Sequence, residues 1–311
     1  MEFRRLGMSG LKVSEVGLGC NNFGMRIDQA GTDSVASAAI EAGVTFFDTA
    51  DVYGAKQSEV MLGKALAGKR HEVVVATKFA MPTGAGPGER GGSRGYVVNA
   101  LEASLKRLGT DYIDLYQMHS PDAETPVEET LRALDAAVRA GKVRYLGNSN
   151  FSGWQIADAD WTARREHLNR FVSAQNNFSL LERNVEREVV PACEHFGLGI
   201  LPFFPLASGL LSGKYTRGEA PPEGTRLAAW GPRGAEALND KAFAKLDALG
   251  EYGQARGHTM LELAFGWLLG HRAVASVIAG ATRPEQVKAN ASAAAWRLSP
   301  DEVAEVTALV K

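Results

Sequence analysis

Short apolar runs alternate along the chain with longer segments of helical periodicity. The apolar runs, rich in β-branched and aromatic residues, cover positions 16–19, 46–47, 73–75, 113–115, 145–147, 171–174, 199–201 and 276–278. Helical patterns cover positions 33–41, 58–67, 94–108, 127–140, 153–165, 185–196 and 284–293. Strands that alternate with single helices predict a parallel sheet, and a series of this length predicts closure into a (β/α)8 TIM barrel.

Three departures from this alternation add detail to the predicted barrel. Positions 3–6 and 11–14 flank a turn and predict an N-terminal β-hairpin ahead of the barrel. Positions 206–238, after the seventh strand, form a long connection rich in glycine and proline, which indicates a functional or disordered loop. Patterns at 241–256, 261–269 and 301–310 predict extra C-terminal helices. We therefore expect a single barrel domain over residues 1–311.

Polar residues follow several of the predicted strands at the point where each strand ends. Asp48 ends the run at 46–47, Lys78 follows the run at 73–75, and His119 follows the run at 113–115. Tyr53 lies in the turn just after Asp48. Because the carboxyl ends of parallel strands meet at one mouth of a barrel, we expect these four side chains to lie close together.

Composition and charge exclude several classes of function. The 311 residues are 45% hydrophobic and 23% charged with a formal net charge of -2, which gives no electrostatic case for binding nucleic acid or an anionic membrane. The longest apolar runs are far shorter than the roughly 18 residues of a membrane span. Cys20 and Cys193 are too few for a disulfide framework and lack metal-ligand spacing. We expect a cytoplasmic protein without a metal site, and its oligomeric state is left open.

Asp48, Tyr53, Lys78 and His119 suit the reduction of a carbonyl group. Hydride addition leaves negative charge on the carbonyl oxygen, so a proton donor must lie within hydrogen-bond reach. A free phenol, with a pKa of about 10, is a weak acid at neutral pH. An ammonium group about 4 Å away, at an effective dielectric near 20, contributes about 4 kcal/mol or roughly three pKa units. We expect Lys78 to lower the pKa of Tyr53 toward physiological pH, and Asp48 to keep Lys78 charged.

Ordered motifs along the chain resemble those of the aldo-keto reductase superfamily. They are found at 47–54, 76–78, 117–119, 147–151, 175–176, 205–215 and 280–286. The resemblance covers essentially the whole chain and implies a barrel whose lower end is plugged by the hairpin. It also implies that Tyr53 is the general acid of a tetrad with Asp48, Lys78 and His119, in which His119 orients the carbonyl oxygen.

The same resemblance implies a nicotinamide cofactor, NADPH, although no Gly-x-Gly-x-x-Gly follows a strand. Ser149, Asn150 and Gln175 suit the carboxamide, and Phe203 stands where the family commonly stacks a Tyr on the nicotinamide. Arg283 lies just before Pro284 at a helix start, where a guanidinium and free N–H groups favour a phosphate. The remaining expected cofactor contacts are Gly19, Leu206, Gly209, Leu211, Ser212, Lys214, Arg226, Gly280, Thr282, Gln286 and Asn290.

The identity of the carbonyl substrate does not follow from the sequence. We expect its pocket to be lined by Asn22, Phe23, Phe79 and Trp230. An alternative to a reductase is a nicotinamide-binding, redox-sensing regulatory subunit, because the resembled family includes potassium-channel β subunits. A Schiff-base aldolase on the same barrel, with Lys78 as nucleophile, is a further alternative.

Overall fold

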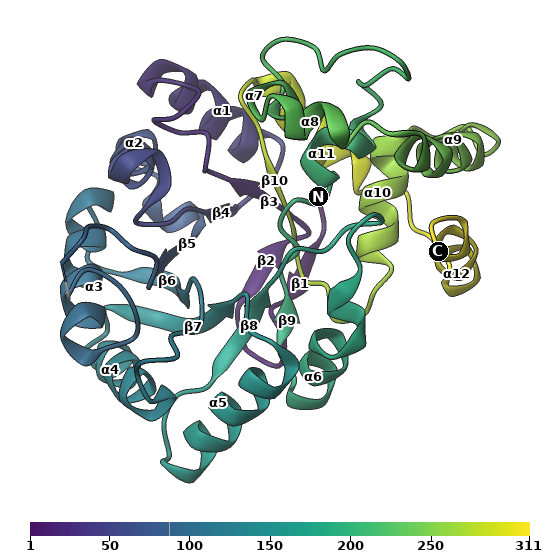
Figure 1. The fold of residues 1–311 in the computed structure, drawn as a ribbon. Coiled ribbons are helices and arrows are strands. Elements are labelled where there is room, and N and C mark those ends of the chain that lie inside the picture. The colour runs from purple at the N-terminus through teal and green to yellow at the C-terminus, as the bar shows by residue number, and fades with distance from the viewer. Residues whose placement is uncertain (87) are drawn as a thin grey trace.

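The computed structural model describes residues 1–86 and 88–311, and this part of the chain forms an eight-stranded parallel sheet surrounded by helices (Figure 1). The strands of this sheet are β3 (Val16–Gly19), β4 (Phe46–Asp48), β5 (Val74–Phe79), β6 (Ile113–Met118), β7 (Val143–Ser149), β8 (Phe171–Gln175), β9 (Gly199–Ile200) and β10 (Val277–Gly280). A hairpin of β1 (Phe3–Arg5) and β2 (Lys12–Ser14) precedes them. The predicted (β/α)8 TIM barrel with an N-terminal hairpin is thus confirmed.

Helices follow the strands and cover the outside of the sheet (Figure 1). They are α1 (Gln29–Glu41), α2 (Gln57–Ala65), α3 (Arg94–Leu108), α4 (Val127–Arg139), α5 (Gly153–Arg165), α6 (Val189–Phe196), α10 (Met260–Leu269) and α11 (Pro284–Ala293). The extra C-terminal helices α9 (Asp240–Gln254) and α12 (Pro300–Leu309) are also present. The predicted helix at 185–196 is divided, because Glu188 has a non-helical φ of -142° between a 3-10 turn and α6.

The sheet closes into a barrel because its two ends meet. In the order β10-β3-β4-β5-β6-β7-β8-β9, each strand pairs with the next. Ile200 in β9 forms a parallel bridge with Val274, just before β10. The N–H of Ile200 donates to the carbonyl of Ala273 at 2.7 Å, and the N–H of Ala275 donates back to Ile200 at 2.9 Å. The carboxyl ends of the strands therefore surround one mouth.

The hairpin plugs the opposite mouth. Leu6 and Val13 are fully buried, and they pack with Phe46, Ala76 and Leu115 in a cluster of their own. These three partners come from β4, β5 and β6, so they point into the barrel and the hairpin fills its lower interior. Figure 1 shows β1 and β2 across the ring of strands.

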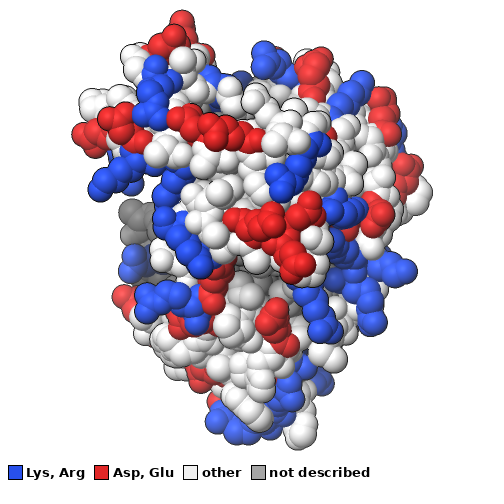
Figure 2. Space-filling model, turned by 90° about the vertical axis from the view of Figure 1, so that its right-hand side faces the viewer, with Lys and Arg blue, Asp and Glu red and all other residues white. Residues whose placement is uncertain are grey.

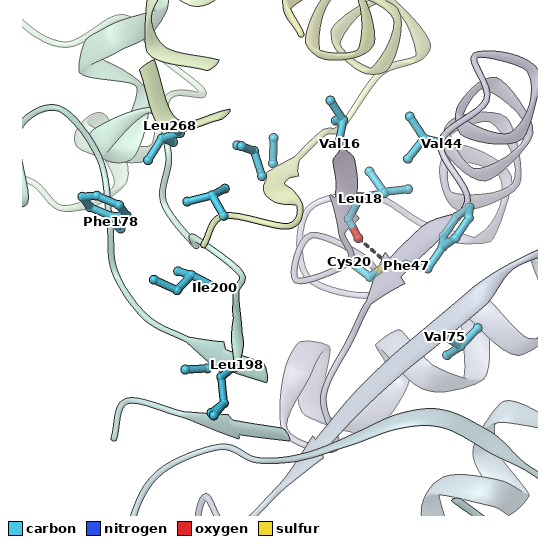
Figure 3. Close-up of a cluster of buried hydrophobic side chains, with 14 of the residues drawn as sticks. Val16, Leu18, Cys20, Val44, Phe47, Val75, Phe178, Leu198, Ile200 and Leu268 are labelled. Carbon is cyan, nitrogen blue, oxygen red and sulfur yellow. Dashed lines mark hydrogen bonds between the residues drawn. The ribbon is translucent and has the colours of Figure 1, made fainter. Parts of the chain in front are cut away.

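The main hydrophobic core lies between the strands and the surrounding helices. Figure 3 shows Leu18 of β3, Phe47 of β4 and Val75 of β5 among its buried side chains. Phe46 and Phe47 thus belong to different clusters, one inside the barrel and one outside it. This alternation follows from the two-residue period of a strand, and it decides which polar residues later in each strand face inward.

The connection at 206–238 has more structure than its sequence predicts. It contains a 3-10 turn, Ala207–Ser212, and the short helices α7 (Arg226–Ala229) and α8 (Pro232–Glu236). The Thr225 hydroxyl caps α7 by accepting from the N–H of Ala228 at 3.3 Å, and Pro232 begins α8. Helices of four and five residues are too short to produce a recognisable periodicity.

Acidic and basic groups are both spread over the face shown in Figure 2. Charges of both signs on one surface agree with the small net charge of the chain, -2. Among the helices of residues 1–86 and 88–311, none is long and apolar enough to cross a membrane.

A substitution of Gly7 in the hairpin turn tests whether the hairpin plug stabilises the barrel. Its φ is +58°, and a Cβ at this position would lie 2.4 Å from the carbonyl oxygen of Gly197 and 2.7 Å from the nitrogen of Gly199. We expect Gly7→Ala to lower the free energy of unfolding by about 2 to 4 kcal/mol, because a left-handed backbone and a backbone clash add together. Gly10→Ala is the matched control, since its Cβ meets only the Tyr145 hydroxyl at 3.5 Å. Chemical denaturation that gives both variants the same stability would contradict this role.

Candidate active site

The two-residue period of the strands aims three polar side chains into the upper part of the barrel. Phe46, Ala76 and Leu115 face inward at the level of the plug. Two residues later in the same strands come Asp48, Lys78 and Gln117, all buried. Each polar side chain therefore lies one inward-facing position closer to the carboxyl end of its strand than an apolar side chain, and the apolar interior shields it from solvent on the hairpin side.

The Lys78 ammonium is the centre of a buried polar network. Lys78 is fully buried, and its Nζ donates to Asp48 Oδ2 at 2.6 Å and to the Thr49 carbonyl at 2.9 Å. The Tyr53 hydroxyl lies 3.3 Å from the same nitrogen. Burial lowers the pKa of Lys78, but Asp48 and Tyr53 raise it further, so its pKa lies above the ordinary value. Lys78 is thus a charged group, and this argues against the aldolase hypothesis, which needs a free amine.

The other oxygen of Asp48 is held by two amides. Asp48 Oδ1 accepts from Gln117 Nε2 at 3.1 Å and from Gln175 Nε2 at 2.9 Å. A buried carboxylate needs several donors to compensate for lost hydration, and here both oxygens have them. Gln175, expected to contact the cofactor, therefore also fixes Asp48.

The direction of the Tyr53 pKa shift differs from the sequence-based expectation. Burial raises the pKa of Tyr53, Lys78 lowers it, and Asp48 raises it again, with the net result above the ordinary value. The expected shift toward physiological pH is wrong, because it counted the charge of Lys78 and neglected the loss of hydration. Tyr53 therefore stays a protonated phenol throughout the physiological pH range.

His119 is a neutral imidazole in this site. Burial and the nearby Lys78 lower the pKa of His119 to about 3. Within the described residues, its Nδ1 is buried without a hydrogen-bond partner. A bare acceptor nitrogen is less costly to bury than an unpaired N–H, so we assign the proton to Nε2. The ring meets Tyr53 edge-on, with centroids 5.7 Å apart.

Tyr53 and His119 lie at a cavity of about 740 Å³ that contains most of the predicted site residues. The predicted residues along its wall are Gly19, Asn22, Asp48, Tyr53, His119, Ser149, Asn150, Gln175, Phe203, Leu206, Gly209, Ser212, Lys214, Arg226, Gly280, Thr282, Arg283, Gln286 and Asn290. The structure thus brings together residues of β3, β4, β7, β8 and β10, of the segments that follow β4 and β6, and of the connection after β9. Lys78 is fully buried behind Tyr53 and Asp48.

Several predicted residues lie elsewhere. Phe23 and Phe79 are fully buried in the outer core, and Phe79 stacks on Tyr116 with ring centroids 4.8 Å apart. Because Lys78 faces inward, the next residue must face the helices, so the expectation for Phe79 is wrong. Leu211 also belongs to the outer core. Trp230, at the end of α7, is 44% exposed and has Arg233 over its ring.

A positively charged group of residues borders the cavity, and sequence reasoning missed one of them. Arg26, in the connection between β3 and α1, lines the cavity together with Lys214 and Arg226. Its guanidinium donates to the Gly224 carbonyl across the opening. Burial and the two neighbouring guanidinium groups lower the pKa of Lys214, and burial and Arg26 likewise lower that of Arg226. The one sequence signal for Arg26 is its place in a loop at the carboxyl end of a barrel strand.

The start of α11 lies at the same cavity. Arg283 is its exposed N-terminal flanking residue, and Pro284 occupies the first turn. The Gln286 side chain accepts from the N–H of Thr282 at 2.8 Å, which fixes this loop on the helix. Asn290, one turn further along, is buried and also lines the cavity.

Comparison with known proteins gives relatives over the whole chain. The model of the Aldo/keto reductase family matches residues 15–311. A probable voltage-gated potassium channel subunit beta of Oryza sativa subsp. japonica is 36% identical, covering 100% of this chain and 97% of its own. The uncharacterized oxidoreductase YrpG of Bacillus subtilis (strain 168) is 38% identical, covering 93% of this chain and 89% of its own. The versiconal hemiacetal acetate reductase of Aspergillus parasiticus is 33% identical, covering 97% and 95%.

The buried pair of Lys78 and Asp48 leads to a stability prediction. Removing one charge leaves the other buried and unpaired, so we expect Lys78→Met or Asp48→Asn alone to lower the free energy of unfolding by about 3 to 5 kcal/mol. The double variant has no unpaired charge and should recover part of the loss, with a coupling energy of roughly 1 to 3 kcal/mol. Urea unfolding of all four proteins measures this coupling, and simple additivity would show that the pair does not act as a unit.

Proposed function

Because the chain belongs to the aldo/keto reductase family, we propose that it reduces an aldehyde or ketone to the alcohol by hydride transfer from NADPH, with Tyr53 as general acid. The observation that carries this proposal is a protonated phenol and a neutral imidazole on the wall of one cavity, with a buried ammonium 3.3 Å from the phenol oxygen. A single carbonyl oxygen can meet the Tyr53 hydroxyl and the Nε2–H of His119 there.

The residues of the tetrad move and stabilise a proton. NADPH, when bound, supplies the hydride. Tyr53 donates its proton to the oxygen of the former carbonyl, since an alkoxide is a far stronger base than a phenolate. Lys78, 3.3 Å from the phenol oxygen, then stabilises the phenolate that remains. Asp48 holds Lys78 in place, and His119 orients the carbonyl oxygen with its N–H. A raised pKa suits this role, because Tyr53 keeps its proton until negative charge develops on the substrate.

The cation-rich wall of the cavity fits the phosphates of a dinucleotide. Lys214, Arg226 and Arg26 repel one another, and this repulsion is relieved when a polyanion lies between them. A Cβ at Gly209 would lie 2.6 Å from Lys214 Nζ, so the glycine leaves room for this ammonium. The nicotinamide end would meet Phe203, Ser149 and Gln175, as the family pattern implies. Arg283 and Asn290 would hold the adenosine end, with Arg283 on the 2′-phosphate.

A redox-sensing regulatory subunit remains a second candidate, because some relatives bear the name of probable voltage-gated potassium channel subunit beta. Such a subunit would bind NADPH at the same cavity and turn over slowly. NADPH oxidation in the presence of a panel of aldehydes and ketones separates the two functions. Multiple turnovers with any carbonyl compound favour the reductase, whereas tight NADPH binding without turnover favours the regulatory subunit.

Replacing Tyr53 tests the general acid. We expect Tyr53→Phe to retain less than about a tenth of wild-type kcat, a rise of at least about 1.4 kcal/mol in the barrier, because the proton donor is lost. NADPH affinity, measured by fluorescence titration, should stay nearly unchanged, because the hydroxyl is not needed for cofactor contacts. Tyr112→Phe is the control, since Tyr112 lies between Arg70 and Arg144, away from the cavity wall. A Tyr53→Phe enzyme with more activity than this limit removes Tyr53 from the mechanism.

Replacing Arg283 tests the preference for NADPH. A charged hydrogen bond to the 2′-phosphate is worth about 1.5 to 3 kcal/mol, so Arg283→Ala should weaken NADPH binding roughly ten- to a hundredfold and leave NADH almost unchanged. Lys288→Ala, an exposed substitution in the same helix, is the matched control. Both cofactors are titrated by fluorescence against the three proteins. Equal losses for NADPH and NADH would show that Arg283 does not recognise the 2′-phosphate.

A further inference from the structure

A second buried acid lies close to the catalytic tyrosine but has no part in the tetrad. Asp51 is 1% exposed and comes two residues before Tyr53. Its N–H donates to the carbonyl of Lys78 at 3.2 Å, and the N–H of Tyr53 donates to Ala50 at 3.2 Å. Asp51 therefore belongs to the turn that carries Tyr53 and fastens this turn to the strand that carries Lys78.

The side chain of Asp51 contacts α3 through Tyr96. The Tyr96 hydroxyl lies 3.3 Å from Asp51 Oδ2 and also 3.3 Å from the carbonyl of Met81. A hydroxyl has one proton, so it can donate to only one of these two acceptors. If Asp51 is ionised, the Tyr96 hydroxyl donates its one proton to either Asp51 or Met81, and its oxygen then lies against the oxygen of the other residue with no proton between them. If Asp51 is protonated, it donates to Tyr96 and Tyr96 donates to Met81, which satisfies both contacts.

The surroundings of Asp51 also disfavour its charged form. Glu59 of α2 is fully buried, and it already takes the Arg107 guanidinium at 2.6 Å and the Thr77 hydroxyl at 2.6 Å. The positive charge of Arg107 is thus already paired with Glu59 and compensates the charge of Asp51 only in part. Within the described residues, Asp51 Oδ1 is buried without a hydrogen-bond partner, as is the hydroxyl of Tyr116 on β6. Burial and the charge of Glu59 raise the pKa of Asp51 to about 7, although Arg107 and Tyr96 oppose them.

We propose that Asp51 is a pH-dependent positioning residue, whose protonated side chain holds the Tyr53 turn against Tyr96 and whose ionisation releases it. This inference rests on the proposed reductase function. The proton leaves Asp51 for solvent base, and no other bond is made or broken. The resulting carboxylate lies beside Glu59, and only the Tyr96 hydroxyl and the backbone of Val52 offer it hydrogen bonds, so the turn shifts to bring water to it. That shift moves the Tyr53 hydroxyl relative to Lys78 and slows proton transfer.

The sign of the pH dependence follows from the raised pKa. The folded-state pKa of Asp51 is about 7, above the value of about 3.9 expected in the unfolded chain. Its contribution to stability is therefore fully present below about pH 4 and is lost as the pH rises through about 7. Activity should also fall as Asp51 loses its proton, because the protonated form of Asp51 is the one that positions Tyr53.

Measurement of kcat and KM between pH 5.5 and 8.5 tests the proposal on the full-length protein. Misplacement of a reacting group by about 1 Å can cost about a hundredfold in rate, so a partial shift should lower wild-type kcat about tenfold above neutrality. Asp51→Asn keeps the shape and an acceptor for Tyr96 but cannot ionise, and it should lose this decline. Asp33→Asn, on the exposed face of α1, is the matched control and should keep it. An unchanged decline in Asp51→Asn overturns the proposal.

A readout that needs no turnover separates this proposal from the proposed function. The 13C-tyrosine ring signal of Tyr53, identified by its loss in Tyr53→Phe, should shift in the wild type with a midpoint near pH 7. It should not shift in Asp51→Asn. If this titration is seen but no carbonyl compound is reduced, the reductase function fails and the positioning role stands. If the wild-type signal does not titrate, or titrates equally in Asp51→Asn, the positioning role is wrong whatever the activity.

Discussion

A fully buried ammonium group must be compensated on every side, and the arrangement around Lys78 follows from this constraint. Its Nζ meets the carboxylate of Asp48, the carbonyl of Thr49 and the hydroxyl of Tyr53, at 2.6, 2.9 and 3.3 Å. The carboxylate in turn needs its own donors, which Gln117 and Gln175 provide. Charge that is expensive to bury alone is thus spread over a network in which each partner fixes the next.

The barrel makes such a network geometrically simple. The two-residue period of a strand sends every second side chain inward, and in a parallel sheet the carboxyl ends of the strands point to the same mouth. Asp48, Lys78 and Gln117 therefore each lie two residues beyond an inward-facing apolar residue of the same strand, namely Phe46, Ala76 and Leu115. The hairpin closes the barrel on the side of these apolar residues, so water can approach the polar side chains from the upper mouth.

The same regularity explains which parts of the site could be predicted from the sequence. Strand ends and ordered motifs were sufficient for the barrel and for the meeting of Asp48, Tyr53 and His119 at one cavity. Alternation also contains the information that Phe79, next to the inward-facing Lys78, faces away from the cavity, and the expectation that Phe79 lines the pocket overlooks it. The pKa of Tyr53 was out of reach, because its direction depends on how much burial outweighs the charge of Lys78. For Arg26 the one sequence signal is its place in a loop at the carboxyl end of a strand, which it shares with many residues, and only the folded loop brings it to the cavity wall.

The two ends of the cavity differ in charge, and this difference affects the acid. Around Tyr53 the charges are paired and His119 is neutral, whereas Arg26, Lys214 and Arg226 form a positive group further along the wall. Arg226 interacts with Tyr53, since the phenolate charge acts to raise the pKa of the guanidinium. By the same interaction, the Arg226 guanidinium favours ionisation of Tyr53, although burial outweighs it and the pKa of Tyr53 stays above its ordinary value. An anion held by these cations cancels this influence, so by linkage its binding and the protonation of Tyr53 strengthen each other. A phosphate-bearing cofactor would then favour the protonated acid that carbonyl reduction requires.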